Sequence, residues 1–219
     1  MNRFLRAAFM VLLVYPVIFI WLGITLRHKE RLPIKGPAII IANHNSHLDT
    51  LTLLTLLPFR TMLQTLPAAA VDYFHRNKWM AWFSDRVIGI IPVNRRQEGQ
   101  GNPLQGCIDA LQDNKIIILF PEGSRGEPDK LSRFKSGLWH LAKEFPEVPV
   151  IPIYLHGLGR AMGKGQHLLV PFFIHVYVGR PCFFNDNKEV FITQLQDRFQ
   201  CMKSRYVTGS EHNEPPPSN

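Results

Sequence analysis

A chain of 219 residues is long enough to bury a core of its own, and its length fits one domain with an appendage. The formal net charge of +8 favours acidic partners, such as phosphorylated ligands, an anionic membrane surface or nucleic acid. The sequence has no paired Cys and His spacings, basic heptads or aromatic RNA-binding run, which argues against nucleic acid. The cysteines are far apart and odd in number, so we expect reduced thiols: Cys107, Cys182 and Cys201.

The N-terminal segment predicts a membrane anchor. Ala7 to Leu26 contains twenty residues without a charge, which as a helix would span about 30 Å of hydrocarbon. A signal peptide would have a shorter apolar region and a cleavage site, which does not occur before Arg27. Four basic residues after this segment outnumber two before it: Arg27, Lys29, Arg31 and Lys35 against Arg3 and Arg6. We therefore expect residues 1–31 to be an anchor with a basic collar in the inner membrane, and the rest to face the cytoplasm.

Beyond the collar, apolar strands alternate with helices. The expected strands are 37–41, 61–66, 87–93, 115–120, 148–154 and 172–178. The expected helices are 48–57, 68–85, 103–113, 134–145 and a last one from a cap at Asp186 or Asn187 to about Met202.

This alternation predicts one α/β domain over residues 32–207. Its sheet is expected to be mixed but mainly parallel, with helices on both faces. Two prolines in the strand at 148–154 predict a place near an edge of the sheet. Residues 208–219 are polar and proline-rich, and we expect them to be disordered.

The stretch from Asn43 to Asp49, Asn-His-Asn-Ser-His-Leu-Asp, joins the first strand to its helix. His44 and Asp49 are five residues apart at this junction, so their side chains can meet. A carboxylate that holds an imidazole fixes its tautomer and stabilises the imidazolium, which makes a general base. This pattern therefore points to His44 as a base and to Asp49 as the residue that orients it.

Two other interpretations of this stretch stay open at this point. Ser46 and Asp49 have the spacing of a capping box, which would give Asp49 a structural role only. His44 and His47 are three residues apart and could bind a metal with Asp49 as a third ligand.

Cationic side chains follow two further strands. Phe120 to Arg125 leaves one strand where α/β folds place ligands, and Arg125 offers a planar fork suited to phosphate. Lys135 stands near the next helix start, which itself favours anions. Another strand ends close to Arg95. With His44 and Asp49, these residues describe a site for a phosphate-bearing nucleophile.

These blocks resemble those of the glycerolipid acyltransferases. His44 and Asp49 match the H-x4-D motif, and residues 120–125 match the F-P-E-G-[ST]-R block. Residues 89–95 resemble the second block and residues 148–153 the fourth, in the same order along the chain. The bacterial 1-acylglycerol-3-phosphate acyltransferases are the most similar subgroup. His47 occupies a variable position, and the resemblance gives it no role.

The resemblance implies direct acyl transfer by residues 32–207. His44 would deprotonate the sn-2 hydroxyl of lysophosphatidic acid, which attacks an acyl thioester of CoA or acyl carrier protein to give phosphatidic acid. The family blocks assign acceptor binding to Arg95, Glu122, Gly123, Ser124, Arg125 and Lys135. They imply no metal and no cofactor beyond the thioester co-substrate, with membrane lipids as surroundings. N–H groups at the helix start near Ser46 could stabilise the oxyanion if they point inward.

Other activities remain alternatives. A relative within the family could acylate glycerol 3-phosphate, another lysophospholipid or a lyso-ornithine lipid. A metal-dependent hydrolase would use His44, His47 and Asp49 and need no acceptor. A non-catalytic membrane adaptor would explain the basic anchor, but not three site blocks.

Overall fold

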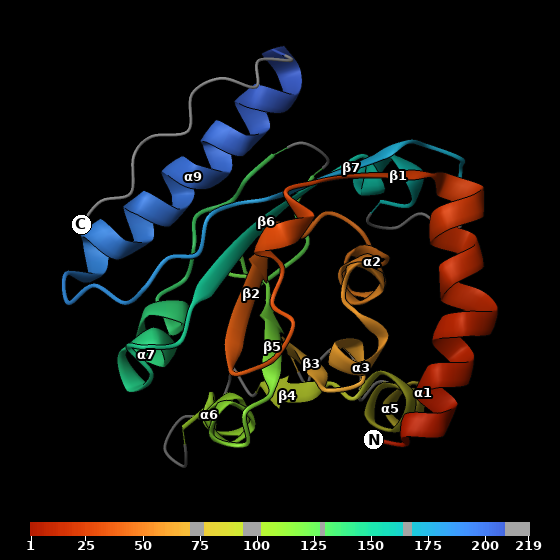
Figure 1. The fold of residues 1–219 in the computed structure, drawn as a ribbon, viewed down its shortest axis with the longest axis horizontal. Helices are drawn as coiled ribbons and strands as arrows, with labels where there is room; N and C mark the ends of the chain where they lie inside the picture. The colour runs from red at the N-terminus through yellow and green to blue at the C-terminus, as the bar shows by residue number, and fades with distance from the viewer. Residues whose placement is uncertain (71–76, 94–101, 128–129, 164–167, 209–219) are drawn as a thin grey trace.

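Seven strands form the centre of the computed structural model, which describes residues 1–70, 77–93, 102–127, 130–163 and 168–208. They make one sheet in the order β1-β7-β6-β2-β5-β3-β4 (Figure 1). The strands are β1 (Ile24–Arg27), β2 (Ala38–Ala42), β3 (Thr65–Ala70), β4 (Ile91–Val93), β5 (Ile116–Leu119), β6 (Val150–His156) and β7 (Ile174–Val178). Within the described ranges, only β6 and β7 pair antiparallel, which confirms a mixed, mainly parallel sheet.

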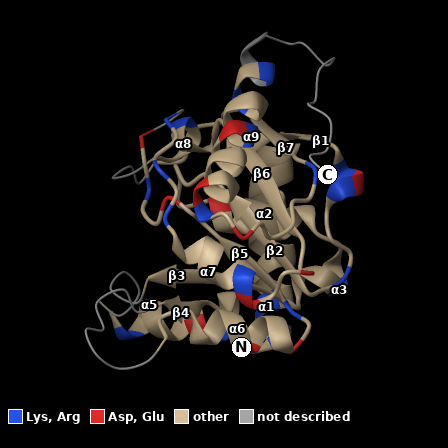
Figure 2. Ribbon diagram, turned by 90° about the vertical axis from the view of Figure 1, so that its left-hand side faces the viewer, with Lys and Arg blue, Asp and Glu red and all other residues tan. Residues whose placement is uncertain are grey.

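The central strands are apolar because they are covered on both faces. All five residues of β2 are buried, and β5 consists of three isoleucines and a leucine. Branched side chains of this kind pack well on a pleated surface that is shielded on both sides. Strands β2, β5, β6 and β7 contain no Lys, Arg, Asp or Glu and are entirely tan in Figure 2.

Helices cover both faces of the sheet, as the alternation of elements predicts. The helices are α1 (Arg3–Phe9), α2 (Asp49–Leu56), α3 (Phe59–Met62), α5 (Lys78–Phe83), α6 (Gln105–Gln112), α7 (Gly137–Glu144), α8 (Leu158–Ala161) and α9 (Lys188–Thr208). Three segments are π-helical, η1 (Met10–Val14), η2 (Pro16–Leu22) and η4 (Ser84–Ile88), and η3 (Lys29–Arg31) is a 3₁₀ turn. In Figure 1, α2 lies between the sheet and the N-terminal helix, whereas α6, α7 and α9 lie on the other side.

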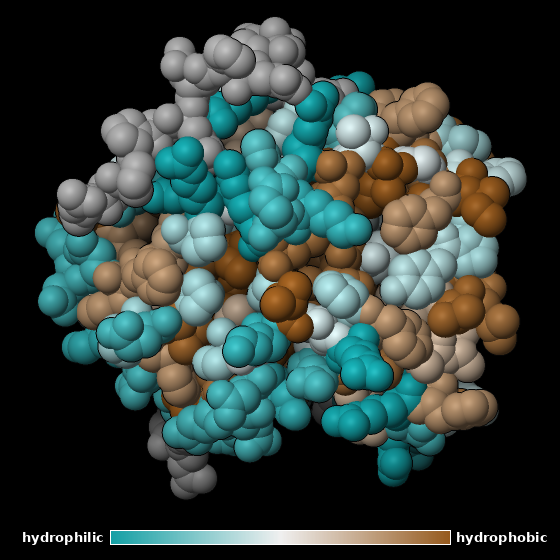
Figure 3. All heavy atoms as spheres, viewed as in Figure 1, coloured by the Kyte–Doolittle hydropathy of each residue, from teal (hydrophilic) through white to brown (hydrophobic). Residues whose placement is uncertain are grey.

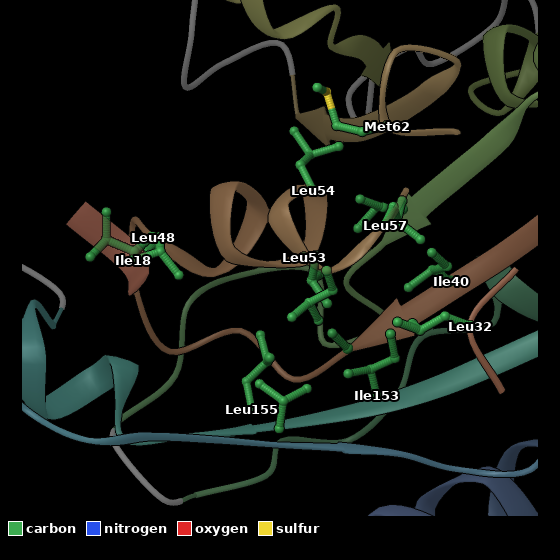
Figure 4. Packing of buried hydrophobic residues seen from close by; sticks show 14 of the residues in the cluster. Ile18, Leu32, Ile40, Leu48, Leu53, Leu54, Leu57, Met62, Ile153 and Leu155 are labelled. Atoms are coloured by element: carbon green, nitrogen blue, oxygen red, sulfur yellow. The ribbon is translucent and has the colours of Figure 1, made fainter. Parts of the chain in front are cut away.

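The N-terminal helix formed by α1, η1 and η2 is packed against the domain along one side. Met10, Val14, Ile18 and Leu22 are at most 3% exposed and belong to the core on the α2 face of the sheet. Figure 4 shows Ile18 in this cluster together with Leu48, Leu53 and Ile40. The same helix, Arg3–Leu22, is the one described segment long and apolar enough to cross a membrane, with a mean hydropathy of 2.2.

The prediction that this helix continues to Leu26 is wrong in its last residues. The helix ends at Leu22, and Gly23 adopts a left-handed φ of 69°. Ile24 then begins β1, which pairs in parallel with β7 at the edge of the sheet. The basic collar therefore starts within a strand, at Arg27.

Two predictions around β3 are also wrong. The expected strand at 61–66 is α3 for its first residues, and β3 begins only at Thr65. Ala68 to Ala70 were expected to be helical but form the end of β3, paired with β4. Alanine has a high helix propensity, but propensity is only a weak guide, and here pairing with β4 overrides it. The expected helix does continue at Lys78, after residues that lie outside the described ranges.

Strand β6 lies inside the sheet, between β7 and β2, so its predicted place near an edge is wrong. The carbonyl of Pro152 accepts a hydrogen bond from the N–H of Gly179 at 2.8 Å. In a strand, the nitrogen of a residue faces the same neighbour as its carbonyl. The Pro152 nitrogen therefore faces β7 beside Gly179, just beyond the last regular pair of Ile153 with Val178. The proline gives up one ladder hydrogen bond at this position, and its carbonyl keeps the other.

The last helix is capped as predicted and is longer than predicted. The side chain of Asn187 accepts hydrogen bonds from the N–H groups of Glu189 and Val190 at 3.0 and 3.1 Å. The helix continues past Met202 to Thr208 and carries charges of both signs (Figure 2). The tail from residue 209, predicted to be disordered, lies outside the described residues.

Candidate active site

The candidate site lies where adjacent parallel strands end. Ile41 of β2 pairs with Leu119 of β5, so the chain leaves both strands side by side. The segment after β2 carries His44, and the segment after β5 carries Glu122 and Arg125. Carboxyl ends of neighbouring parallel strands are the usual ligand-binding position in α/β folds.

His44 and Asp49 meet as the sequence predicts. Nδ1 of His44 donates to Oδ2 of Asp49 at 2.9 Å, which leaves Nε2 of the neutral ring without a proton. The side chain of Asp49 is 1% exposed and that of His44 is 21% exposed. One nitrogen of the imidazole is thus held by a buried carboxylate, and the other is available to a substrate.

The same carboxylate oxygen also shapes the loop. Oδ2 of Asp49 accepts from the N–H groups of Asn45 and Ser46 at 2.7 and 2.8 Å. The Ser46 hydroxyl accepts in turn from the N–H of Leu48 and donates to the carbonyl of Met162. The two interpretations of Asp49, as a structural cap and as the partner of His44, are therefore compatible, because its carboxylate makes both sets of contacts.

These contacts limit one expectation. The N–H groups of Asn45 and Ser46 donate to Asp49, and the N–H of His44 donates to Oε1 of Glu122 at 3.1 Å. These three groups are therefore already engaged, and an oxyanion site formed by the other N–H groups at the helix start stays a prediction.

The ring of His44 is held by an aromatic neighbour. It stacks on Phe120, with centroids 4.0 Å apart and an interplanar angle of 19°. Stacking on one face and a hydrogen bond at one edge restrict both torsions of the side chain. The imidazole is therefore fixed in place before any substrate binds.

Glu122 joins the two loops. It is 3% exposed, Oε1 accepts from the N–H of His44, and Oε2 accepts from the N–H of Ser132 at 3.0 Å. Burial raises the pKa of Glu122, and the two backbone hydrogen bonds oppose that rise in part. A further bond from the N–H of Gly126 to the carbonyl of His44, at 2.8 Å, ties the loops together. The predicted contact of Glu122 with the acceptor stays a prediction. In the structure, the Glu122 carboxylate stabilises the loop that carries His44.

The structure brings two of the three predicted cations to the His44 cleft. Arg125 lines the cleft, and its Nη1 donates to Nε2 of His47. Lys135 also lines it, with its N–H bound to the carbonyl of Pro121 at 2.8 Å. Arg95 lies outside the described residues.

Gly123 suits this arrangement, chiefly through its backbone conformation. Its φ is 77°, which L side chains rarely adopt. A Cβ atom at this position would lie 2.9 Å from Cε of Lys135. The glycine thus lets the lysine pass close to the loop, and Ser124 beside it lines the cleft.

The cleft has a volume of about 1190 Å³, and both polar and apolar side chains line it. The polar lining includes His44, His47, Ser124, Arg125, Lys135, Ser136, His140, Lys143 and Glu144. The apolar lining includes Leu51, Ala68, Ala69, Ala70, Ile88, Ile90, Val93, Leu104, Ile108 and Leu119. The cleft therefore offers cationic groups and apolar surface in one space with His44.

The metal interpretation finds no geometry in the described part of the chain. No three His, Cys, Asp or Glu side chains gather there in a way that could hold an ion. Nε2 of His47 contacts Arg125. Burial raises the pKa of Cys107 to about 12, so that thiol stays protonated.

Two contributors were missed from the sequence. Phe120 supports His44, and it follows Leu119, the last residue of β5 paired with β2. Asn43 follows β2, and its amide bonds both the N–H and the carbonyl of Leu155, at 2.7 and 2.8 Å. Asn43 thus extends the pairing between β2 and β6 by one side chain and fixes where the His44 loop begins. A polar residue directly after a buried strand is the signal that would have identified it.

Comparisons with known proteins point to one family. The family model named Acyltransferase matches residues 23–156. A chloroplastic 1-acyl-sn-glycerol-3-phosphate acyltransferase from Brassica napus is 29% identical over 63% of this chain and 38% of its own length. A protein of the same name from Chlamydomonas reinhardtii is 32% identical over 65% of this chain and 41% of its own length. The chain thus spans less than half the length of these relatives.

A solved structure shares the fold. The 1-acyl-sn-glycerophosphate acyltransferase from Thermotoga maritima superimposes with a TM-score of 0.69 at 18% sequence identity. The match covers 84% of this chain and 72% of that chain. This likeness confirms the predicted α/β architecture, including a mostly parallel sheet and an apolar N-terminal helix.

Proposed function

This chain belongs to the acyltransferase family, and we propose that it acylates the sn-2 hydroxyl of 1-acylglycerol 3-phosphate to form phosphatidic acid. The acyl donor in this proposal is a thioester of CoA or of acyl carrier protein. The observation that carries the proposal is the His44–Asp49 pair, 2.9 Å apart, in a cleft that also holds Arg125 and Lys135.

In the proposed reaction, Nε2 of His44 takes the proton from the acceptor hydroxyl. The oxygen attacks the thioester carbonyl, the carbon–sulfur bond breaks, and the leaving thiolate takes the proton back from His44. Asp49 stabilises the imidazolium that exists between the two proton transfers. Because the base is regenerated, the step needs no covalent enzyme intermediate.

The cations are proposed to hold the acceptor phosphate. Arg125 can form two parallel hydrogen bonds to phosphate oxygens, and Lys135 adds a point charge. Arg95, which follows β4 in the chain, is proposed as a third cation. The apolar side chains that line the cleft, such as Leu51, Ile90 and Leu119, offer surface for an acyl chain.

The N-terminal helix is proposed to bring the enzyme to the membrane. Its inner side belongs to the core, while Phe4, Leu12 and Ile20 on its outer side are 78, 77 and 83% exposed. Phe83, at the end of α5, packs edge-on against Phe9 of α1 with ring centroids 5.0 Å apart, and Trp79 and Trp82 of α5 are exposed. Figure 3 shows hydrophobic residues along the edge of the molecule formed by this helix.

We name the exposed residues Phe4, Leu12, Ile20, Trp79 and Trp82 the apolar ridge. A helix with one side inside the protein presents only the other side to lipid, so the ridge is proposed to rest in one leaflet. The basic collar then favours the anionic cytoplasmic face of the inner membrane.

The test is acceptor-dependent thiol release by the purified full chain in lipid vesicles or detergent. Lysophosphatidic acid, glycerol 3-phosphate, other lysophospholipids and a lyso-ornithine lipid would be supplied in turn with acyl-CoA, and with acyl carrier protein thioester in parallel. The proposal expects the fastest release with lysophosphatidic acid and little without an acceptor. Equal thioester cleavage with water alone would refute it.

A further inference from the structure

The side chain of His47 points to a role that the family motif does not give it. His47 lies in the loop between β2 and α2, three residues after His44, and its Nε2 accepts a hydrogen bond from Nη1 of Arg125. Both side chains line the cleft that contains His44. The contact joins the first motif block to the arginine of the third.

The backbone around His47 is fixed from several directions. Asn45 and Ser46 donate their N–H groups to Asp49, and the Ser46 hydroxyl donates to the carbonyl of Met162 at 2.6 Å. The amide of Asn45 also donates to the carbonyl of Glu127. The backbone that presents His47 is therefore fixed, while the His47 side chain itself is exposed at the cleft.

The side chain of Arg125 has more conformational freedom than the backbone that carries His47. This side chain is long, and the residue is only partly buried. A free arginine loses rotamer entropy when it fixes a ligand, whereas one already held in place loses less. A neutral imidazole can hold it through Nε2 without neutralising its charge, which a carboxylate in the same place would do.

We propose that His47 is a positioning residue that holds the Arg125 guanidinium beside His44 and thereby tightens binding of the acceptor's phosphomonoester. The inference rests on the proposed function for the identity of the ligand, but the contact itself does not depend on catalysis. His47 acts through Arg125 and takes no proton from the substrate.

The experiment is a double-mutant cycle on the full chain, with His47→Leu, Arg125→Ala and both together. Its first readout is the dissociation constant for glycerol 3-phosphate as a phosphomonoester probe, measured by calorimetry without an acyl donor. Its second readout is KM and kcat for lysophosphatidic acid. Far-UV circular dichroism and the unfolding temperature check that each variant is folded.

We expect His47→Leu to weaken phosphomonoester binding about fivefold, and to raise KM by a similar factor with a smaller change in kcat. In the Arg125→Ala background the same substitution should change binding by less than about twofold, because the group it positions is gone. His47→Gln should restore most of the affinity, since its amide oxygen can accept from the arginine.

The outcomes separate the two proposals. An equal loss of affinity from His47→Leu with and without Arg125 would overturn the positioning role, as would failure of His47→Gln to restore binding. Coupled binding in a protein that transfers no acyl group would support the positioning role and contradict the proposed function. Acyl transfer without coupling would do the reverse.

Discussion

Replacing Asp49 with asparagine tests whether the buried carboxylate serves the reaction as well as the fold. Oδ2 of Asp49 accepts from three donors, at 2.9, 2.7 and 2.8 Å. Within the described residues, Oδ1 is buried and has no hydrogen-bond partner. An asparagine oxygen can take the place of Oδ2, but its NH₂ group then lies in the unpartnered position of Oδ1.

The magnitude follows from these contacts. Burying the NH₂ group without a partner costs about 1–3 kcal/mol of unfolding free energy. The imidazolium of His44 also loses the negative charge beside it. The attraction between two such charges is about 4 kcal/mol at 4 Å with an effective dielectric constant near 20, and we expect roughly half or more of it to be added to the activation barrier. A barrier increase of about 2–4 kcal/mol lowers kcat roughly 30- to 1000-fold.

The assay is thiol release with saturating lysophosphatidic acid, together with urea unfolding of the same preparation. Thr52→Val is the matched control, since Thr52 lies on the same helix, is fully buried, and has a hydroxyl with no partner in the described part of the chain. We expect the control to keep the free energy of unfolding of the original protein and a kcat within about twofold of the original value. Asparagine at position 49 with normal kcat and lowered stability would show that Asp49 is a cap only.

Four further outcomes are expected. His44→Ala should lower kcat roughly 10²–10⁴-fold in the thiol-release assay, and near-normal transfer would remove the assignment of the base. Arg125→Ala should raise KM for lysophosphatidic acid roughly 10–150-fold, and an unchanged KM would contradict the phosphate role. Because burial raises the pKa of Glu122 above its value in the unfolded chain, the folded state binds more protons at this residue, and its contribution to the free energy of unfolding falls as pH rises above the ordinary carboxyl pKa. Glu122→Gln should remove this pH-dependent contribution, as measured by urea unfolding at a series of pH values. The same dependence of stability on pH in the variant and the original protein would refute it. Ile20→Glu, at a residue 83% exposed, should reduce sedimentation with anionic vesicles without unfolding the protein, and unchanged sedimentation would contradict the role of the apolar ridge.

The sequence predicts most of the chemistry because the motif residues are close in the chain or follow adjacent strands. His44 and Asp49 are separated by one turn of loop, and their contact follows from local geometry. Arg125 reaches the same cleft because β5 lies beside β2, whereas the apolar patterns of the two strands indicate only that both are buried. The cap at Asn187 is likewise local.

The parts that could not be predicted depend on tertiary partners. Strand β1 has four residues in a segment whose hydrophobicity favours a longer helix, and only pairing with β7 makes it a strand. Ala68 to Ala70 form strand because they pair with β4, while the preceding residues of β3 pair with β5. The bracing role of Glu122 depends on Ser132, whose place beside the carboxylate no spacing rule gives.

The dual nature of the N-terminal helix has a consequence for handling the protein. Four of its side chains complete the interior on one side of the sheet, at roughly 1.5–3 kcal/mol each, which adds up to about 6–12 kcal/mol. That sum is comparable with the whole stability of an ordinary domain, about 5–15 kcal/mol. Trimming the first 22 residues to obtain a water-soluble fragment would therefore remove part of the folded body itself, and detergents that compete for those four side chains should unfold the protein.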